Sequence, residues 1–271
     1  MLRRLLLKYE YPSNSIVCKY NVTDNTTINV LGSNFQLSQL ESMVVDGIKY
    51  PVAYTHNFNS VGMHTIVYLF NPANLTSLYG MFSGCSELVD VRFINSVSYN
   101  LSLNRTFANC TSLTHVDISS LDTTNVVTTE YCFYVCSKLR SINMHTNNFG
   151  NVTTMEAMFS KCSALKYLDT MYMTTSTNLI NLYGMFNECF ELSDIYLGNI
   201  NTTNVTNMEY MFALCRNLYK VSFYTPVNNV LSAYGMFYGI TTVGTLLYHS
   251  NFDYSVIIEQ LPSTWTTSTV V

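Results

Sequence analysis

The residues best suited to chemistry are cysteines, because six of the eight recur at a nearly constant spacing. They are Cys85, Cys110, Cys136, Cys162, Cys189 and Cys215. Such thiols could form a zinc site, a ladder of disulfides or a set of nucleophiles. Zinc would need further ligands, and no His or Cys stands at the usual spacing. Disulfides need Cα atoms about 4.4–6.8 Å apart, closer than packed helices usually allow; Cys132 and Cys136 are the best remaining pair. We therefore favour thiols that act as small buried hydrophobes, and predict no metal and no cofactor.

The five histidines offer no recognisable catalytic arrangement. His56, His64, His115, His145 and His249 are dispersed along the chain. None lies in an HExxH, Cys-His or Ser-His pattern, and no glycine-rich phosphate loop follows a predicted strand. The sequence therefore favours a protein that is not an enzyme.

A repeat explains the cysteine spacing. The motif Met-Phe-x-x-Cys-x-x-Leu recurs seven times, and its phenylalanines are 25, 26, 26, 27, 26 and 25 residues apart. These are Phe82, Phe107, Phe133, Phe159, Phe186, Phe212 and Phe237. In the seventh copy Ile240 replaces the cysteine, which supports a buried position.

Each repeat contains two apolar periods, which predict two elements. From Met155 to Cys162 the apolar residues stand at i, i+3, i+4 and i+7, the stripe of an amphipathic helix of about two turns. Thr153 with Glu156, and Thr206 with Glu209, have capping-box spacing. After the cysteine follows a Leu-x-x-apolar-x-apolar segment, which alternates as a half-buried strand does.

One short helix and one strand cannot bury their apolar faces alone, so successive repeats must stack. We predict an α/β solenoid of seven leucine-rich-like coils, each with a short helix and a parallel strand. Helices pack about 8–10 Å apart, wider than strands at about 4.8 Å. The solenoid should therefore form an arc with the sheet on its concave side.

The two ends lack the repeat. Residues 1–72 predict a small β-sandwich-like capping or attachment domain, with strands at 5–11, 15–22, 27–31 and 64–70. Asp46-Gly47 predicts the turn of a hairpin over 43–50. Residues 73–248 form the solenoid, and 249–271 a C-terminal cap with a short helix over 254–261 that Pro262 ends.

The composition limits the kinds of partner that the protein can bind. The 271 residues are 48% hydrophobic and 11% charged, with a net charge of -4. Such a balance cannot provide the basic field that nucleic-acid binding requires. We read no signal peptide after Met1, and no window approaches the roughly 18 apolar residues of a membrane span.

Recognition is better supported, because the residues between the apolar strand positions must point outward in stacked rows. These rows mix tyrosines, amides and both charges, which suits a protein or glycan ligand. The candidate ligand-binding residues on this concave face are Arg92, His115, Asp117, Tyr167, Asp169, Asp194, Tyr196 and Lys220. A solvated face without a ligand is the alternative.

Residues 74–248 resemble the BspA-like leucine-rich repeats of gut bacteria. Their pattern Asn-Val-Thr-x-Met-x-x-Met-Phe-x-x-Cys-x-x-Leu is matched nearly throughout at 151–165 and 204–218. The second repeat departs from it with Arg105-Thr106 before the phenylalanine, and the third has Cys132 for Met. The resemblance implies surface display and adhesion without enzymatic activity.

These inferences favour a non-catalytic recognition or structural module on the surface of a bacteriophage virion, as a fibre or decoration protein. The solenoid would bind protein or glycan, and residues 1–72 another virion or surface protein. A virion protein leaves its host by lysis, which would explain the missing signal peptide. One alternative is a bacterial cell-surface adhesin. A second is a carbohydrate-active enzyme that uses carboxylates such as Asp117 and Asp169, about 10 Å apart on the strand spacing.

Overall fold

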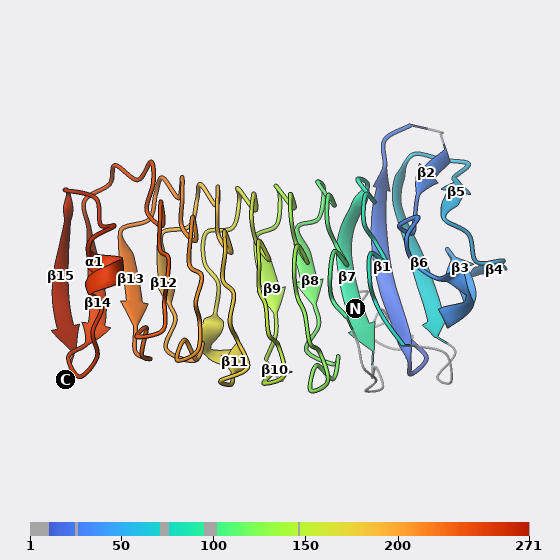
Figure 1. The fold of residues 1–271 in the computed structure, drawn as a ribbon. Coiled ribbons are helices and arrows are strands. Elements are labelled where there is room, and N and C mark those ends of the chain that lie inside the picture. The colour runs from blue at the N-terminus through green and yellow to red at the C-terminus, as the bar shows by residue number, and fades with distance from the viewer. Residues whose placement is uncertain (1–10, 25–26, 71–75, 95–101, 146, 271) are drawn as a thin grey trace, which may run out of the picture.

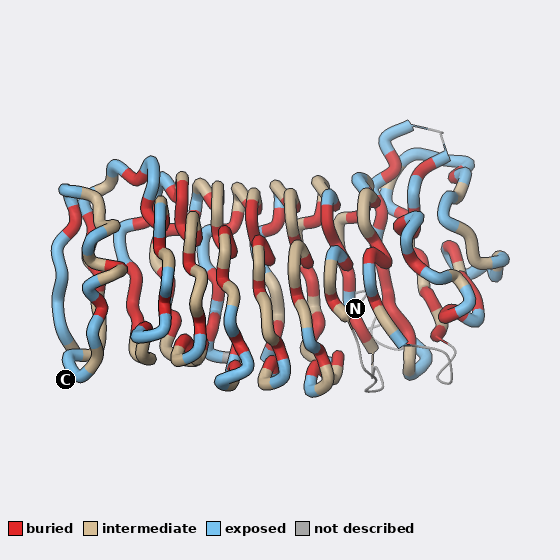
Figure 2. Tube along the Cα trace, viewed as in Figure 1, coloured by how far each residue is buried: buried red, intermediate tan, exposed pale blue. Residues whose placement is uncertain are grey.

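The computed structural model describes residues 11–24, 27–70, 76–94, 102–145 and 147–270. Seven coils, numbered here by the order of their repeat phenylalanines, stack in a nearly straight row (Figure 1). Their buried side chains form one continuous core, and buried and exposed positions alternate along each coil (Figure 2). The predicted strand at 5–11, except for its last residue, and the predicted boundary between residues 72 and 73 lie outside the described residues.

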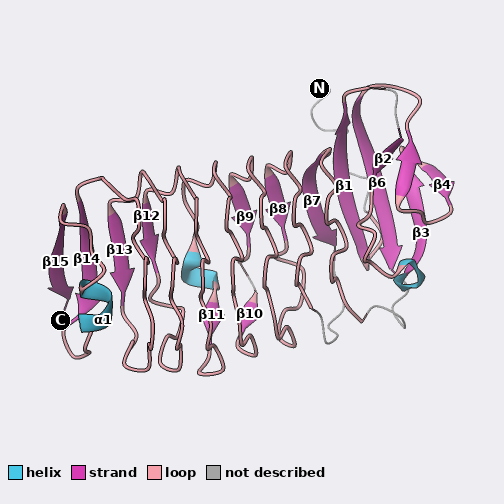
Figure 3. Cartoon of the chain, turned by 45° about the horizontal axis from the view of Figure 1, so that its top comes forward, coloured by secondary structure: helices cyan, strands magenta, loops and turns pink. Residues whose placement is uncertain are grey.

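One side of the stack is a parallel sheet, as predicted. Its first group of strands is β7 (Leu88–Ile94), β8 (His115–Asp117) and β9 (Ser141–Asn143). Its second group is β12 (Asp194–Tyr196), β13 (Lys220–Phe223), β14 (Gly244–His249) and β15 (Trp265–Val270). The register aligns the buried repeat positions, so Val91 lies opposite Val116, and Ile195 opposite Val221. Figure 3 shows both groups in one row, interrupted between β9 and β12.

The predicted helix in each coil is wrong. The segment from Met155 to Cys162 and its equivalents are runs of tight turns, which we call the turn side. Their amides alternate between two acceptors. Met158 N donates to Met155 O at 3.2 Å within the coil, whereas Phe159 N donates to Met185 O of the next coil at 2.9 Å. Because alternate amides bond to a neighbouring coil, the i→i−4 ladder of an α-helix cannot form.

Left-handed residues make these turns possible. Two positions in each segment have positive φ, for example Gly80 at 60° and Gly84 at 78° in coil one, and Tyr131 at 54° and Val135 at 60° in coil three. The stripe at i, i+3, i+4 and i+7 is buried as predicted, but on a backbone that is not helical.

The predicted capping boxes are also wrong, since no helix begins at either threonine. Thr153 Oγ1 donates to Val127 O, and Thr206 Oγ1 to Ile180 O, each at 3.3 Å. Both acceptors belong to the preceding coil. These hydroxyls therefore link coils and cap nothing.

The expected arc with a concave sheet is absent for the same reason. On the turn side the repeat phenylalanines stack with ring centroids 5.2 to 5.8 Å apart. Neighbouring strands on the other side lie about 4.8 Å apart. With nearly equal pitch on both sides, the stack stays almost straight (Figure 1).

The N-terminal strands extend the solenoid sheet in antiparallel fashion. β1 (Ser15–Val22) lies between β7 and β6 (Gly62–Phe70), followed by β3 (Leu40–Val45) and β4 (Ile48–Tyr50). A second small sheet pairs β2 (Thr27–Asn29) with β5 (Thr55–Asn57), and a 3₁₀ turn covers Leu37–Gln39. The predicted strands within 15–70 and the Asp46-Gly47 hairpin are confirmed. The Tyr68 ring lies 5.9 Å from that of Phe82, so this region covers the first coil.

The C-terminal residues add one more strand beyond the seventh coil. The predicted helix is confirmed as the short α1 (Ser255–Ile258), and β15 then pairs with β14 in parallel, which the sequence did not predict. Within the described part of the chain, no helix is long and apolar enough to cross a membrane.

Candidate functional site

The outward-pointing side chains that alternate with the buried strand residues form what we call the sheet face. Six predicted site residues occupy such positions in strands: Arg92, His115, Asp117, Asp194, Tyr196 and Lys220. Tyr167 and Asp169 flank the buried Leu168 in coil four, whose corresponding segment is not a strand. The eight residues fall into two groups, with Lys220 in register with Asp194.

The first group lies on β7 and β8 and is engaged with its neighbours. Arg92 Nε lies 3.9 Å from Asp117 Oδ2, and Asp117 Oδ1 also accepts from Ser119 N at 3.0 Å. His115 Nδ1 lies 2.9 Å from Ser141 Oγ. These side chains link adjacent coils.

The second group lies where the parallel sheet is interrupted. Thr170 stands at the position that Leu197 occupies in coil five. Leu197 N donates to Ser222 O of the next coil at 2.8 Å, whereas in coil four the Thr170 hydroxyl donates to the equivalent carbonyl of Tyr196. A side chain has thus taken an acceptor that a strand amide would use.

Asp169 completes the interruption. Its Oδ1 accepts from Met171 N at 3.0 Å and caps the 3₁₀ turn η3 (Thr170–Tyr172). The chain therefore leaves the strand path directly after Leu168. Further along coil four the chain pairs in parallel again. There β11 (Thr174–Thr175) lies beside β10 (Asn148–Phe149) of the preceding coil.

A pocket of about 450 Å³ lies at this interruption. Leu168 and Thr170 form part of its lining, together with Tyr167, Asp169, Asp194, Tyr196, Met171 and Asn199. Four of the eight predicted residues are therefore brought together, two from each of the adjacent coils four and five. Arg92, His115, Asp117 and Lys220 do not line it.

Two tyrosines present aromatic surface at the pocket. Tyr167 is 57% exposed and Tyr196 42% exposed. A Cβ atom at Gly198 would collide with the Tyr196 ring and hydroxyl, so the ring rests where only glycine leaves room. The Tyr224 ring, 5.2 Å away between centroids, supports Tyr196 as well. Gly198 and Tyr224 therefore hold the Tyr196 ring in position.

Some polar atoms of the pocket already form hydrogen bonds within the protein. Asn199 Nδ2 donates to Met171 O at 2.7 Å, which ties coil five to η3. Asp194 Oδ2 accepts from the Tyr219 hydroxyl at 3.3 Å, and the negative charge of Asp194 raises the pKa of Tyr219. Lys166 Nζ lies 5.3 Å from the centroid of the Tyr167 ring, a cation–π distance.

Sequence reasoning missed Met171, Asn199 and Gly198. A usable signal was Thr170, a polar residue at a position that is apolar in neighbouring coils. Met171 and Asn199 lie outside the alternating strand positions, so the outward-pointing rule could not select them.

The same repeats identify a family. Residues 52–172 and 169–260 match a family described as a Mycoplasma protein of unknown function, DUF285. The chain belongs to this family. The two matched segments include all seven repeat phenylalanines. No curated protein and no solved structure matches the chain.

The cysteines of the DUF285 repeats lie in the core. All eight cysteines are free and buried, which confirms the interpretation of the recurring six as buried residues. The structure adds a role: Cys162 Sγ donates to Phe133 O of the preceding coil at 3.1 Å, and four other repeat cysteines do the same. These bonds start from Cys110, Cys136, Cys189 and Cys215, at 3.0 to 3.1 Å. Burial raises the pKa of these thiols, which suppresses the reactive thiolate.

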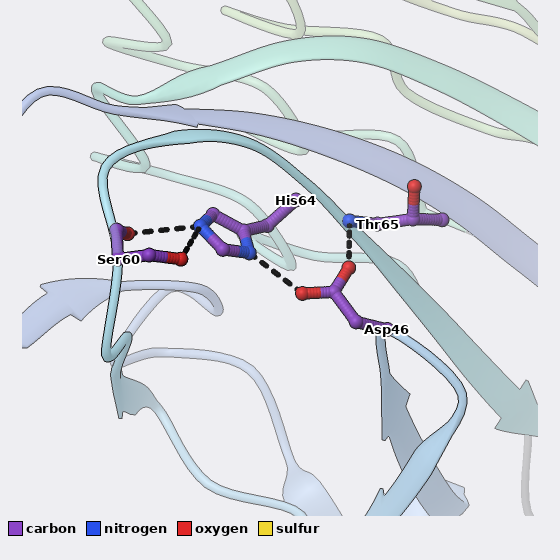
Figure 4. Close-up of polar contacts among 4 residues, drawn as sticks. All are labelled: Asp46, Ser60, His64 and Thr65. Carbon is purple, nitrogen blue, oxygen red and sulfur yellow. Dashed lines mark hydrogen bonds and ion pairs between the residues drawn. The ribbon is translucent and has the colours of Figure 1, made fainter.

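Before the first coil, one cluster has the residue types of a catalytic triad. His64 Nδ1 lies 2.6 Å from Asp46 Oδ2, and His64 Nε2 lies 3.4 Å from Ser60 Oγ (Figure 4). However, Nε2 also lies 2.9 Å from the Ser60 carbonyl oxygen, which can only accept. Both ring nitrogens therefore serve as donors, and the imidazolium cannot take a proton from Ser60.

This cluster fastens the N-terminal hairpin. Burial alone would lower the pKa of His64, but the hydrogen bonds to Asp46 and to the Ser60 carbonyl raise it above its usual value. Asp46 Oδ1 also accepts from Thr65 N at 2.8 Å. The cluster thus links the β3–β4 turn to β6 and to the loop before it, and we call it the hairpin clamp.

Proposed function

We propose that this DUF285 chain is a non-catalytic recognition module that binds protein or glycan through its sheet face. The pocket between coils four and five carries the proposal. It combines two exposed tyrosines with polar groups from adjacent coils, on a scaffold whose backbone is bonded from coil to coil. Rigid aromatic anchors beside adaptable polar groups are typical of recognition surfaces.

The proposal that the module is not an enzyme has chemical support. A general acid at neutral pH needs a carboxyl group kept protonated by burial or by a like charge. Asp169 is exposed and already caps η3, while Asp194 accepts a hydrogen bond from Tyr219. Neither carboxylate has the apolar surroundings of such an acid.

Two further proposals concern placement. The kinship with BspA-like repeats supports display on an exposed surface, which we propose to be that of a bacteriophage virion, with a bacterial cell surface as the alternative. Residues 1–72 would contact another virion or surface protein. Ile48, Val61 and Met63, each more than half exposed, provide apolar area there.

Binding through the sheet face can be tested with single substitutions. Purified chain is titrated onto host cells, and Tyr167→Ala and Tyr196→Ala should each weaken binding about tenfold or more. The matched control is Tyr234→Ala, an equally large change at a 65% exposed tyrosine of the turn side. If only Tyr234→Ala weakened binding, the sheet face would not be the recognition surface.

Placement can be tested by mass spectrometry of purified phage particles and of the host envelope fraction. A fixed stoichiometry in particles supports a virion component. Detection in the envelope alone supports the adhesin and rules out the virion.

A further inference from the structure

We propose that the pocket between coils four and five binds a neutral sugar residue. The inference rests on the proposed recognition function and names the ligand class that the pocket favours. Three properties of the pocket support it: its aromatic surfaces, its hydrogen-bonding capacity and its charge.

The aromatic surfaces suit the carbon–hydrogen faces of a sugar ring. Tyr167 and Tyr196 come from adjacent coils, and both are exposed at the pocket. Tyr196 is held against Gly198 and Tyr224, so it loses little conformational entropy when a ligand packs on it. The pocket volume falls at the lower end of the range for small-molecule sites, about 300–1,000 Å³, which suits one or two sugar residues.

The hydrogen-bonding capacity favours a ligand that donates. Within the described residues, Asp169 uses only Oδ1, toward Met171 N, and the bonds of Asp194 involve only Oδ2. Asn199 uses its Nδ2, which leaves its carbonyl oxygen to accept. Apart from the Tyr167 and Tyr196 hydroxyls, which can donate or accept, the remaining capacity is therefore three oxygens that only accept. Sugar hydroxyls can donate to all of them, and O–H bonds to carboxylates are among the stronger hydrogen bonds.

The charge favours a neutral ligand over a charged one. The two carboxylates at the pocket are balanced by two ammonium groups on the same face. Lys166 lies over the Tyr167 ring, and Lys220 is in register with Asp194. A balanced set of charges gives no net field to attract an acidic sugar or a cationic side chain.

The arrangement of the four predicted residues is also suitable. In coil-to-coil alignment Tyr167 corresponds to Asp194, and Asp169 to Tyr196, so rings and carboxylates alternate in a two-by-two pattern. A ligand that packs on either ring therefore has a carboxylate beside it. Sugars present hydroxyl groups around the edge of an apolar face, which matches this pattern.

The test uses the intact chain and immobilised polymers: a glucan, a mannan and a galactan as neutral probes, polygalacturonate as an acidic probe and polylysine as a cationic probe. We expect binding to at least one neutral polymer that changes less than twofold between about 0.05 and 0.5 M salt. Asp169→Asn and Asp194→Asn should each weaken it roughly tenfold. Tyr234→Ala should leave it unchanged.

Gly198→Ala separates pocket binding from general adhesion. The added methyl group must displace the Tyr196 ring, so affinity for the neutral polymer should fall although position 198 contributes no ligand contact. Circular dichroism and the unfolding midpoint establish that each variant is folded. Tyr196→Ala, which needs no space, serves as the second variant should Gly198→Ala not fold.

The outcomes are distinguishable. Binding only to polygalacturonate or only to polylysine would overturn the neutral-sugar assignment. If no polymer bound while Tyr167 and Tyr196 were still required for attachment to host cells, the sugar inference would fail and the recognition function would stand. If those tyrosines were dispensable for both, both proposals would fall.

Discussion

The two long sides of each coil keep neighbouring coils at nearly the same distance, but they do so with different hydrogen-bond patterns. On the strand side, residues such as Ile195 and Val221 pair in an ordinary parallel ladder. On the turn side, amides alternate between bonds within a coil and bonds to the next coil, with left-handed residues at every second turn. The strand side leaves one face of side chains in water, whereas the turn side directs the Met, Phe and Cys side chains of the repeat motif into the core.

The difference separates the residues that stabilise the stack from those that form the proposed recognition surface. The repeat phenylalanines and cysteines of the turn side are fully buried and bonded or stacked from coil to coil. The sheet face can vary because its side chains contribute little to that core. Coil four shows the consequence: Thr170 and Asp169 interrupt the ladder and open a pocket, while the Phe159 ring stays stacked in line.

The largest expected effect on stability comes from coil four, where one substitution on the turn side can be compared with one on the sheet face. Phe159→Ala removes a ring stacked 5.4 Å from Phe133 and 5.5 Å from Phe186, and should cost about 3–5 kcal/mol of unfolding free energy. Tyr167→Ala, on the sheet face of the same coil, should cost less than about 0.5 kcal/mol. Urea denaturation measures both. Equal losses would show that the two sides do not differ in this way.

The sequence allowed the strand side to be predicted correctly, but on the turn side it led to the wrong prediction of a helix. Alternating apolar residues such as Ile195 and Leu197 gave the strands, because a strand has one backbone geometry. The stripe from Met155 to Cys162 has helical spacing, but two turns with left-handed residues bury the same positions. Glycines at those positions in coil one, Gly80 and Gly84, were the available signal.

Half of the residues that line the pocket could be predicted from the sequence, for a related reason. Tyr167, Asp169, Asp194 and Tyr196 followed from the outward-pointing rule and from stacking of adjacent coils. Met171 lies in η3, which is specific to coil four, so no comparison between repeats could indicate it. The repeat predicts what the coils share, while the pocket depends on what one coil does differently.

The second prediction concerns the left-handed residues of the turn side. Gly84 and Val135 occupy equivalent positions with φ of 78° and 60°. Gly84→Ala should destabilise the fold by about 1–2 kcal/mol, because a Cβ there meets no neighbour but disfavours this conformation. Val135→Gly should stabilise it by up to about 1 kcal/mol. Thermal unfolding of both variants tests the signs, and destabilisation by Val135→Gly would contradict a strained valine.

The third prediction concerns the buried thiols. Cys162→Ala removes the donor to Phe133 O and some buried volume, and should cost about 1–2 kcal/mol. Cys162→Ser keeps a donor and provides the comparison. Because burial raises the pKa of this thiol, a thiol reagent at mildly alkaline pH should label the folded wild type only as fast as it unfolds. Rapid labelling without unfolding would show that the turn side is open to solvent.

The smallest effect concerns the N-terminal end, where the strand side continues into antiparallel strands and no repeat stabilises the last hairpin. The hairpin clamp supplies a local link there. Asp46→Asn keeps an acceptor for Thr65 N but removes the negative charge beside His64. We expect a loss below about 1 kcal/mol, since Asp46 is half exposed.

The pH dependence identifies the cause of that loss. The pKa of His64 is raised in the folded protein, so the clamp contributes fully below the unfolded value, about 6.5, and its contribution disappears as the pH rises through the folded value. Urea midpoints of wild type and Asp46→Asn should therefore differ at about pH 5.5 and converge at about pH 8.5. Ser60→Ala retains the carbonyl that accepts from Nε2 and should leave the midpoint unchanged at both pH values. A difference between wild type and Asp46→Asn that stayed constant with pH would mean that Asp46 acts through Thr65 alone.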